Sequence, residues 1–281
     1  MVISTGDSWR IKGLRNASRY TGLDIEVPYQ PQWPLHVVES FRRNSMKGST
    51  PNIGIGQTQC WLGHLNVLQE IVHRSFATAL VFEDDVDWDV DIKYELALVS
   101  PLIRQVWSCD GGDDDKTLFG SCWDILWLGH CGDIIASDAL SVWDYTSLPS
   151  GFYQENDDQL TPFPARTRMV HVSQGPICTY AYAVTNKSAA KLVQMVGDGV
   201  DETTSTQFRL WCQNGRLRCI TVSPELFHHH KSKGQLSSNI ALVEGWEMAE
   251  VPIETDFTKN IRYSSRCSSR AGRDASCEDS T

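Results

Sequence analysis

The stretch that decides the fold is Thr78-Ala-Leu-Val-Phe-Glu-Asp-Asp-Val-Asp-Trp-Asp-Val90, an apolar run that ends abruptly in carboxylates. The run predicts a buried strand, and Glu83, Asp84 and Asp85 follow at its carboxyl end. Open α/β sheets bind their ligands at that end of their strands. Clustered carboxylates repel one another and are costly to desolvate, so a divalent cation with oxygen ligands is one reason to gather them. The alternative is a solvated loop or a cap for the next helix.

Helical and strand patterns alternate along the rest of the chain. Helices are predicted over residues 9–21, 35–43, 60–75, 92–106 with a break at Pro101, and 203–212. Further strands are predicted over residues 125–128 and 218–222. This alternation predicts an α/β fold with a mixed, mainly parallel central sheet that is flanked by helices on both faces.

Two other segments lack a periodic apolar pattern. Residues 134–169 contain three prolines, which predicts a long loop, and residues 264–281 are rich in Ser, Arg and Gly, which predicts a disordered tail. A chain of 281 residues that is 41% hydrophobic can bury a substantial core. We therefore expect one domain over residues 1–263, and we expect its N-terminal strand to be truncated because the chain begins inside that strand.

The charge of the chain limits the classes of partner. Its 25 basic and 35 acidic residues give a net charge of −10, which argues against a nucleic-acid-binding or anionic-membrane surface. A bound nucleotide phosphate would have to be neutralised locally, by a metal ion or a few basic residues. No apolar run is as long as the roughly 18 residues that a membrane-spanning helix needs. The apolar stretch at residues 1–5 is too short for the hydrophobic region of a signal sequence.

The nine cysteines are an odd number, so at least one of them is free. They show no Cys-x-x-Cys spacing of the kind that binds zinc. Cys212 and Cys219 flank a predicted turn at Asn214-Gly215, and this spacing allows either a hairpin disulfide or two buried thiols.

Further motifs accompany the carboxylates. They are Gly56-Gln-Thr-Gln-Cys-Trp-Leu-Gly-His64, Trp123-Asp-Ile-Leu-Trp-Leu-Gly-His130 and Cys178-Thr-Tyr-Ala-Tyr-Ala-Val184, in this order along the chain. Together with the Glu-Asp-Asp strand, they resemble glycosyltransferase family 25, the group of lipooligosaccharide and collagen-type galactosyltransferases. Trp61 and the Trp88-Asp89 pair resemble its fungal members. The resemblance covers roughly residues 3–240.

The resemblance implies a GT-A type nucleotide-sugar-binding fold and a metal-dependent, inverting glycosyltransferase. Such an enzyme would move a hexose, with galactose the first choice, from a UDP-sugar to a hydroxyl of a glycan, lipid or protein. The implied cofactor is Mn²⁺, with Mg²⁺ as the alternative. The full-length product is expected in the lumen of the Golgi or endoplasmic reticulum, where an N-terminal anchor outside this chain would be its only membrane attachment.

The resemblance also assigns roles to residues. Asp85 and Asp84 are the expected metal ligands, with His228 preferred to His230 as a third ligand; a polar loop is the alternative for these histidines. The donor is expected to contact Glu83, Asp84, His64, His130 and Tyr182. His64 could equally be a structural histidine, and Tyr182 could simply fill the core.

An inverting reaction requires a base that deprotonates the acceptor hydroxyl. Asp201 is the expected base and Glu202 the next candidate, although Asp201 could also cap the helix that follows it. Two other functions remain open: a non-catalytic carbohydrate-binding protein on the same fold, and a metal-dependent hydrolase. The former would not need the acidic cluster that is present here, and the latter would hydrolyse the donor as its main activity.

Overall fold

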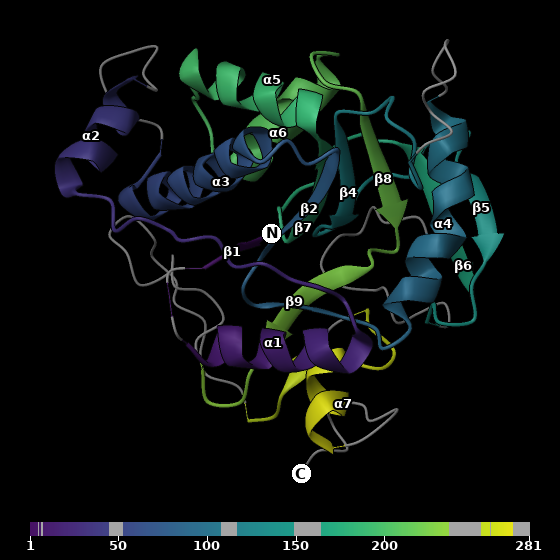
Figure 1. Ribbon diagram of the computed structural model, residues 1–281. Helices are drawn as coiled ribbons and strands as arrows, with labels where there is room; N and C mark the ends of the chain where they lie inside the picture. Colours follow the sequence, from purple (N-terminus) through teal and green to yellow (C-terminus); the bar gives the residue numbers. More distant parts are fainter. Residues whose placement is uncertain are drawn as a thin grey trace.

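The computed structural model describes residues 1–4, 6, 8–44, 53–107, 117–148, 164–235, 254–258 and 260–271. A seven-stranded sheet lies at its centre, with helices on both faces (Figure 1). The order of its strands is β1 (Val2–Ile3), β2 (Thr78–Glu83), β7 (Ala181–Thr185), β4 (Ile125–Gly129), β8 (Cys219–Ser223), β6 (Thr167–Val172) and β5 (Leu140–Trp143).

The sheet is mixed, as the sequence predicts, but antiparallel neighbours outnumber parallel ones. Of its six neighbouring pairs, β1/β2 and β4/β8 are parallel and the other four are antiparallel. The expectation of a mainly parallel sheet is therefore wrong for the strand pairing. The reason is that β7 and β6 each run against both of their neighbours.

A second, three-stranded sheet continues from the end of β2. It contains β10 (Phe257–Thr258), β9 (Phe227–Lys231) and β3 (Val86–Trp88), in that order. Glu83 is the last residue of β2, so Asp84 and Asp85 form the link between the two sheets. The carboxylates therefore lie at the carboxyl end of an internal strand, which confirms this part of the prediction.

Two groups of helices cover the large sheet. One face carries α3 (Ile55–His73), α5 (Asn186–Gly197) and α6 (Thr204–Gln213), and α2 (Leu35–Asn44) packs on α3. The other face carries α1 (Trp9–Thr21) and α4 (Ile92–Val106), together with β3 and β9. All five residues of β4 are buried, because this strand lies between both layers (Figure 1).

Two predicted features of the chain differ in the structure. Helix α4 continues through Pro101 without a break; Pro101 is exposed, while Val99 and Ile103 on either side of it anchor the helix in the core. The region predicted as a long loop contains β5 and the first half of β6. Residues 149–163 of this region lie outside the described part.

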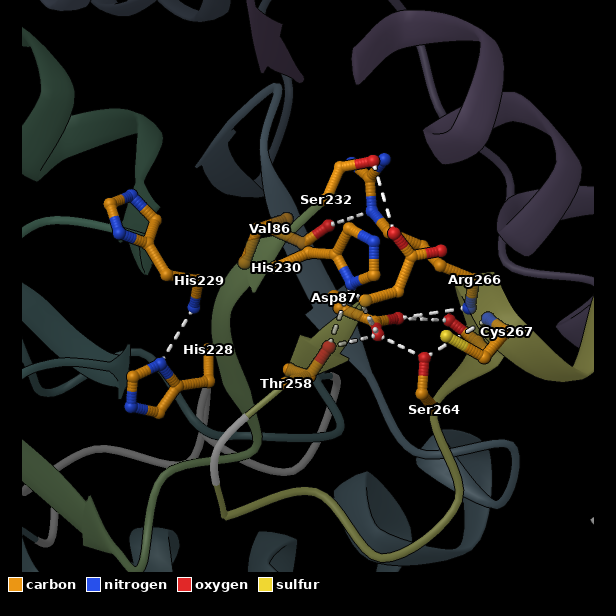
Figure 2. A network of polar contacts seen from close by, with 12 residues as sticks. Val86, Asp87, His228, His229, His230, Ser232, Thr258, Ser264, Arg266 and Cys267 are labelled. Carbon is orange, nitrogen blue, oxygen red and sulfur yellow. Dashed lines mark hydrogen bonds and ion pairs between the residues drawn. The ribbon is translucent and has the colours of Figure 1, made fainter. Parts of the chain in front are cut away.

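The segment expected to be a disordered tail contains α7 (Ser265–Ala271), which packs against α1. That expectation is wrong for residues 264–271, and residues 272–281 are outside the described ranges. Asp87 of β3 anchors this segment from a position with no exposed surface (Figure 2). It accepts hydrogen bonds from the hydroxyls of Ser264, Ser265 and Thr258 and from the backbone amide of Arg266.

Arg266 of α7 crosses from the C-terminal segment to the link between the sheets. Its guanidinium donates to the backbone carbonyls of Asp84 at 2.6 Å, Val86 at 2.7 Å and Arg10 at 3.0 Å. A Cβ atom at Gly13 of α1 would lie 2.5 Å from this guanidinium, so glycine leaves the room that Arg266 occupies. The side chain thus joins α1, β3 and the carboxylate turn.

Two disulfides join described residues, Cys131–Cys178 and Cys212–Cys219. Cys212 and Cys219 therefore form a disulfide and are not two buried thiols. Structural disulfides are typical of proteins that mature outside the reducing cytosol. Among the helices of the described ranges, none combines the length and the apolar character that crossing a bilayer requires.

Candidate metal centre

The three carboxylates at the end of β2 point to different neighbours. Oε1 of Glu83 accepts a hydrogen bond from the Thr179 hydroxyl at 3.3 Å. Asp84 turns toward the N-terminal segment, where Ser4 Oγ donates to it at 2.6 Å. Asp85 turns inward and is 3% exposed. In this arrangement, the three side chains do not converge on a single cation.

Asp85 lies between a guanidinium and an imidazole. Its Oδ2 is 3.0 Å from Nη1 of Arg10 and 3.3 Å from Nε2 of His229. Burial acts to raise the pKa of Asp85, but His229 and Arg10 outweigh it and hold the pKa well below its usual range. Its other oxygen, Oδ1, is buried and has no hydrogen-bond donor in the described part of the chain.

His229 reaches Asp85 because β9 pairs with β3 in one particular register. In that register, His229 lies opposite Val86, the residue after Asp85. The Tyr180 ring stacks on the imidazole with a centroid separation of 4.1 Å. Burial lowers the pKa of His229, while Asp85 and Glu83 raise it more, so the net shift is upward. Its Nε2 makes no hydrogen bond to the described residues.

The neighbouring histidines of β9 face other groups. Nε2 of His228 is 3.3 Å from Oε1 of Glu225, and burial lowers the pKa of His228 to about 4. The ring of His230 turns toward Asp87 and Thr258, whereas the rings of His228 and His229 lie away from that network (Figure 2). The structure therefore brings His229, and not the predicted His228, beside Asp85.

Glu83, Asp85 and His229 form one of two ligand groups at this place. Each offers one ligand atom, and these atoms lie within 4.8 Å of one another. The second group consists of Cys60, His64 and the same Glu83, with the same limit on its ligand atoms. Oδ1 of Asp85 is buried without a hydrogen bond, and Nε2 of His229 faces the Asp85 carboxylate; a divalent cation that displaces the proton of His229 can bind both atoms, so the residues present fit a metal ion.

His64 and Tyr182, both predicted to contact the donor, lie on the inner side of this centre. Each is fully buried, and Nδ1 of His64 is 2.9 Å from the Tyr182 hydroxyl. Nε2 of His64 faces Oε1 of Glu83 at 3.9 Å. Burial acts to lower the pKa of His64, but Tyr182, Cys60 and Glu83 around the ring raise it well above its ordinary value.

Asp84 is held by the N-terminal part of the chain. Besides the Ser4 hydroxyl, Nη1 of Arg10 lies 3.6 Å from its Oδ1. Burial and the adjacent charge of Asp85 raise the pKa of Asp84, although Ser4 and Arg10 oppose that shift. Its role as a metal or donor ligand stays a prediction, and the structure places it outside both ligand groups.

His130 and Asp133 follow β4 and have their polar atoms occupied. Nε2 of His130 lies 3.0 Å from the Val222 carbonyl, and its Nδ1 accepts from the amide of Gly132. Asp133 accepts from the Thr221 hydroxyl and from backbone amides at 134, 174 and 175. Both side chains thus hold loops in place, and a donor contact by His130 remains a prediction.

Asp201 and Glu202 lie just before α6, and both are partly exposed. The N-cap of α6 is Thr203, so the alternative role of Asp201 as the helix cap is wrong. The indole of Trp61 donates to the Glu202 carbonyl at 2.8 Å. This contact places the predicted base segment beside α3, next to Cys60 of the second ligand group.

Sequence reasoning did not single out four residues that surround the carboxylates: Cys60, His229, Arg10 and Arg266. Arg10 and Arg266 are both at least 93% buried, and they supply positive charge beside the carboxylates of an acidic chain. Their spacing along the chain gives no signal. His229 belongs to a visible run of three histidines, but the strand register that selects it cannot be read from the run.

No family model and no curated protein matches this chain.

Proposed function

We propose that this chain is a metal-dependent, inverting hexosyltransferase of the GT-A type, related to glycosyltransferase family 25 and acting in the secretory pathway. Its donor would be a UDP-sugar, with UDP-galactose the first candidate, and its acceptor a hydroxyl group. The observation that carries the proposal is the group Glu83, Asp85 and His229 at the end of β2, where the buried Oδ1 of Asp85 has no hydrogen bond and Nε2 of His229 faces the same carboxylate. The resemblance in sequence supplies the class of reaction.

Glu83, Asp85 and His229 would hold Mn²⁺, or Mg²⁺ as the alternative. When bound, the ion would act as a Lewis acid that stabilises charge on the departing nucleotide diphosphate. Arg10 fixes the carboxylate of Asp85, and Tyr180 holds the plane of the His229 ring by stacking. These contacts keep the ligands oriented before any donor arrives.

Asp201 would deprotonate the acceptor hydroxyl, with Glu202 as the second candidate. Their position supports this role, because Trp61 contacts the Glu202 carbonyl and the adjacent Cys60 shares the second ligand group with Glu83. Partial exposure of both carboxylates would leave them open to an acceptor that enters from solvent. A general base of this kind typically contributes about 10²–10⁴-fold to the rate.

The test uses two adjacent histidines of β9 as a matched pair. UDP-sugars are titrated into the full chain with Mn²⁺ by calorimetry, and UDP release is measured with and without hydroxyl acceptors. His229→Gln should weaken Mn²⁺-dependent donor binding at least about tenfold, as loss of a metal ligand requires, whereas His228→Gln should leave it nearly unchanged. Asp201→Asn should keep donor binding while turnover falls.

Thermal melts of each variant exclude unfolding as the cause of a loss. Mn²⁺-independent donor binding, or equal effects of the two histidine variants, would contradict the proposed centre. UDP release that never depends on an acceptor would indicate a hydrolase. Donor or glycan binding without any turnover would indicate a carbohydrate-binding protein.

A further inference from the structure

The second ligand group places three different ligand atoms around one point. Cys60 and His64 are four residues apart on α3 and so share one side of that helix. Glu83 approaches them from the end of β2, and the sulfur, nitrogen and oxygen atoms lie within 4.8 Å of one another. A thiol, an imidazole and a carboxylate are a ligand set that zinc binds, whereas Mg²⁺ and Mn²⁺ favour oxygen ligands.

His64 is prepared to bind through one particular nitrogen. Its ring is fully buried, and Nδ1 is engaged by the Tyr182 hydroxyl at 2.9 Å. The rings of His64 and Tyr182 also stack, with centroids 5.6 Å apart. Nε2 remains, and it has no hydrogen-bond partner among the described residues. A hydrogen bond that fixes one ring nitrogen and leaves the other for a cation is the usual arrangement around a metal-bound histidine.

Cys60 can supply a thiolate to this site. It is a free cysteine and is only partly buried, so solvent ions can reach it. Its sulfur lies 3.8 Å from the Thr204 hydroxyl, a contact too weak to prevent binding. A third group in the described residues, His230, Asp256 and Cys267, offers no such ligand because Cys267 is disulfide-bonded.

We propose that Cys60, His64 and Glu83 form a binding site for a thiophilic divalent ion of the zinc class. The three protein ligands leave a fourth position open. Glu83 also belongs to the group with Asp85 and His229, so zinc at this site would withdraw a ligand from the proposed Mn²⁺ centre. Zinc would therefore inhibit the proposed transferase; only this last consequence rests on the proposed function.

Cobalt serves as the spectroscopic probe for the site. Titration of Co²⁺ into the full, non-reduced chain should produce a thiolate-to-cobalt charge-transfer band that saturates at one equivalent. Zn²⁺ should abolish the band. Cys60→Ser should eliminate it, and His64→Gln should weaken Co²⁺ binding at least about tenfold. His228→Gln, at a buried histidine of β9 that lies outside both ligand groups, should change nothing.

Alkylation of Cys60 gives a second measurement that does not need the His64 variant to fold. Zn²⁺ should protect Cys60 of the wild-type chain from iodoacetamide, and Asp85→Asn should retain that protection. Absence of both the band and the protection would overturn the site. Loss of protection in Asp85→Asn would show that the two ligand groups are not separate sites, because a single mixed centre would then hold the ion. Neither readout uses a sugar donor, so failure of the proposed transferase activity leaves this test intact.

Discussion

Glu95 of α4 shares one buried guanidinium with a second carboxylate. Nη2 of Arg168 lies 2.7 Å from Oδ2 of Asp144 and 3.3 Å from Oε1 of Glu95. The Thr146 hydroxyl also donates to Glu95, at 2.7 Å. Burial raises the pKa of Glu95 from its ordinary 4.5 to about 8, against the opposing effect of Arg168. One positive charge thus faces two carboxyl groups, and Glu95 is the one that stays protonated at neutral pH.

This arrangement predicts that the protein loses stability as the pH rises from about 4.5 to about 8. Because the pKa in the folded state exceeds that in the unfolded state, the contribution of Glu95 is complete below about pH 4.5 and disappears as the pH rises through about 8. Between these values, the free energy of unfolding should fall by up to about 1.4 kcal/mol per pH unit from this group.

Glu95→Gln mimics the protonated carboxyl and should flatten the dependence. Urea denaturation at a series of pH values between about 5 and about 9 measures this dependence of the free energy of unfolding on pH. The control is Glu254→Gln, which changes an exposed carboxyl. Parallel curves for the wild type and Glu95→Gln would show that Glu95 is not protonated in the folded state.

Candidate residues could be predicted where neighbouring residues in the sequence identify them. They could not be predicted where only the tertiary structure distinguishes one residue from similar neighbours. Glu83 to Asp85 could be identified from the sequence, because three consecutive carboxylates follow directly on an apolar run. His229 differs from its neighbours only by the register of β9 against β3, a long-range property. The neutral state of Glu95 depends on its burial between α4 and β6, and β6 carries Arg168 in a segment predicted as loop.

Gly129 ends β4 where three strands approach closely. A Cβ atom there would lie 2.9 Å from the Ala181 nitrogen of β7 and 2.9 Å from the Phe227 carbonyl oxygen of β9. Both contacts are with backbone, which cannot rotate away. The register of β4 against β7 also shifts between Trp127 and Gly129. Glycine therefore allows the small sheet to pack against the end of the large one.

Gly129→Ala should destabilise the fold by about 1–3 kcal/mol, the usual cost of overpacking, and should displace β9. Denaturation midpoints measure the first effect, and Mn²⁺ affinity reports the second through His229. Gly197→Ala is the matched control, since nothing lies within 4 Å of a Cβ at this last residue of α5. Equal midpoints for the two variants would mean that the strands separate without cost.

Elements with an apolar pattern were predictable, and those held by polar contacts were not. The bounds of α1, 9–21, and of α4, 92–106, follow from their spacing of buried residues. In contrast, α7 has the sequence Ser-Arg-Cys-Ser-Ser-Arg-Ala, which shows no apolar stripe. Asp87 and the carbonyls around Arg266 stabilise it instead, and no local rule reveals partners so distant along the chain.

At the scale of the whole molecule, Asp87 ties the middle of the chain to its C-terminal segment. Asp87→Asn removes the buried charge and replaces one carboxylate oxygen, which accepts two hydrogen bonds, by an amide nitrogen that cannot accept, so the substitution should cost about 3–5 kcal/mol. Because the donors of these hydrogen bonds lie in residues 258–266, the C-terminal segment should become the first site of cleavage in limited proteolysis. Urea denaturation and mass spectrometry of the fragments measure the two effects.

Asp138→Asn provides the comparison, since Asp138 is exposed. A variant at Asp87 that denatures and is cleaved like the Asp138 variant would show that α7 is held by other contacts. Simultaneous cleavage throughout the chain would mean that α7 does not open separately.

The contact between Arg266 and the Asp84 carbonyl spans 182 residues. At a translation rate of about 5–20 residues per second, the ribosome needs roughly ten to forty seconds to make the intervening chain. During that time β2 and the carboxylate turn have left the exit tunnel, while the guanidinium that fixes them does not yet exist. The nascent chain therefore exposes an acidic turn that can attract ions or chaperones before the centre is complete, and the order of synthesis makes this centre one of the last parts of the molecule to form.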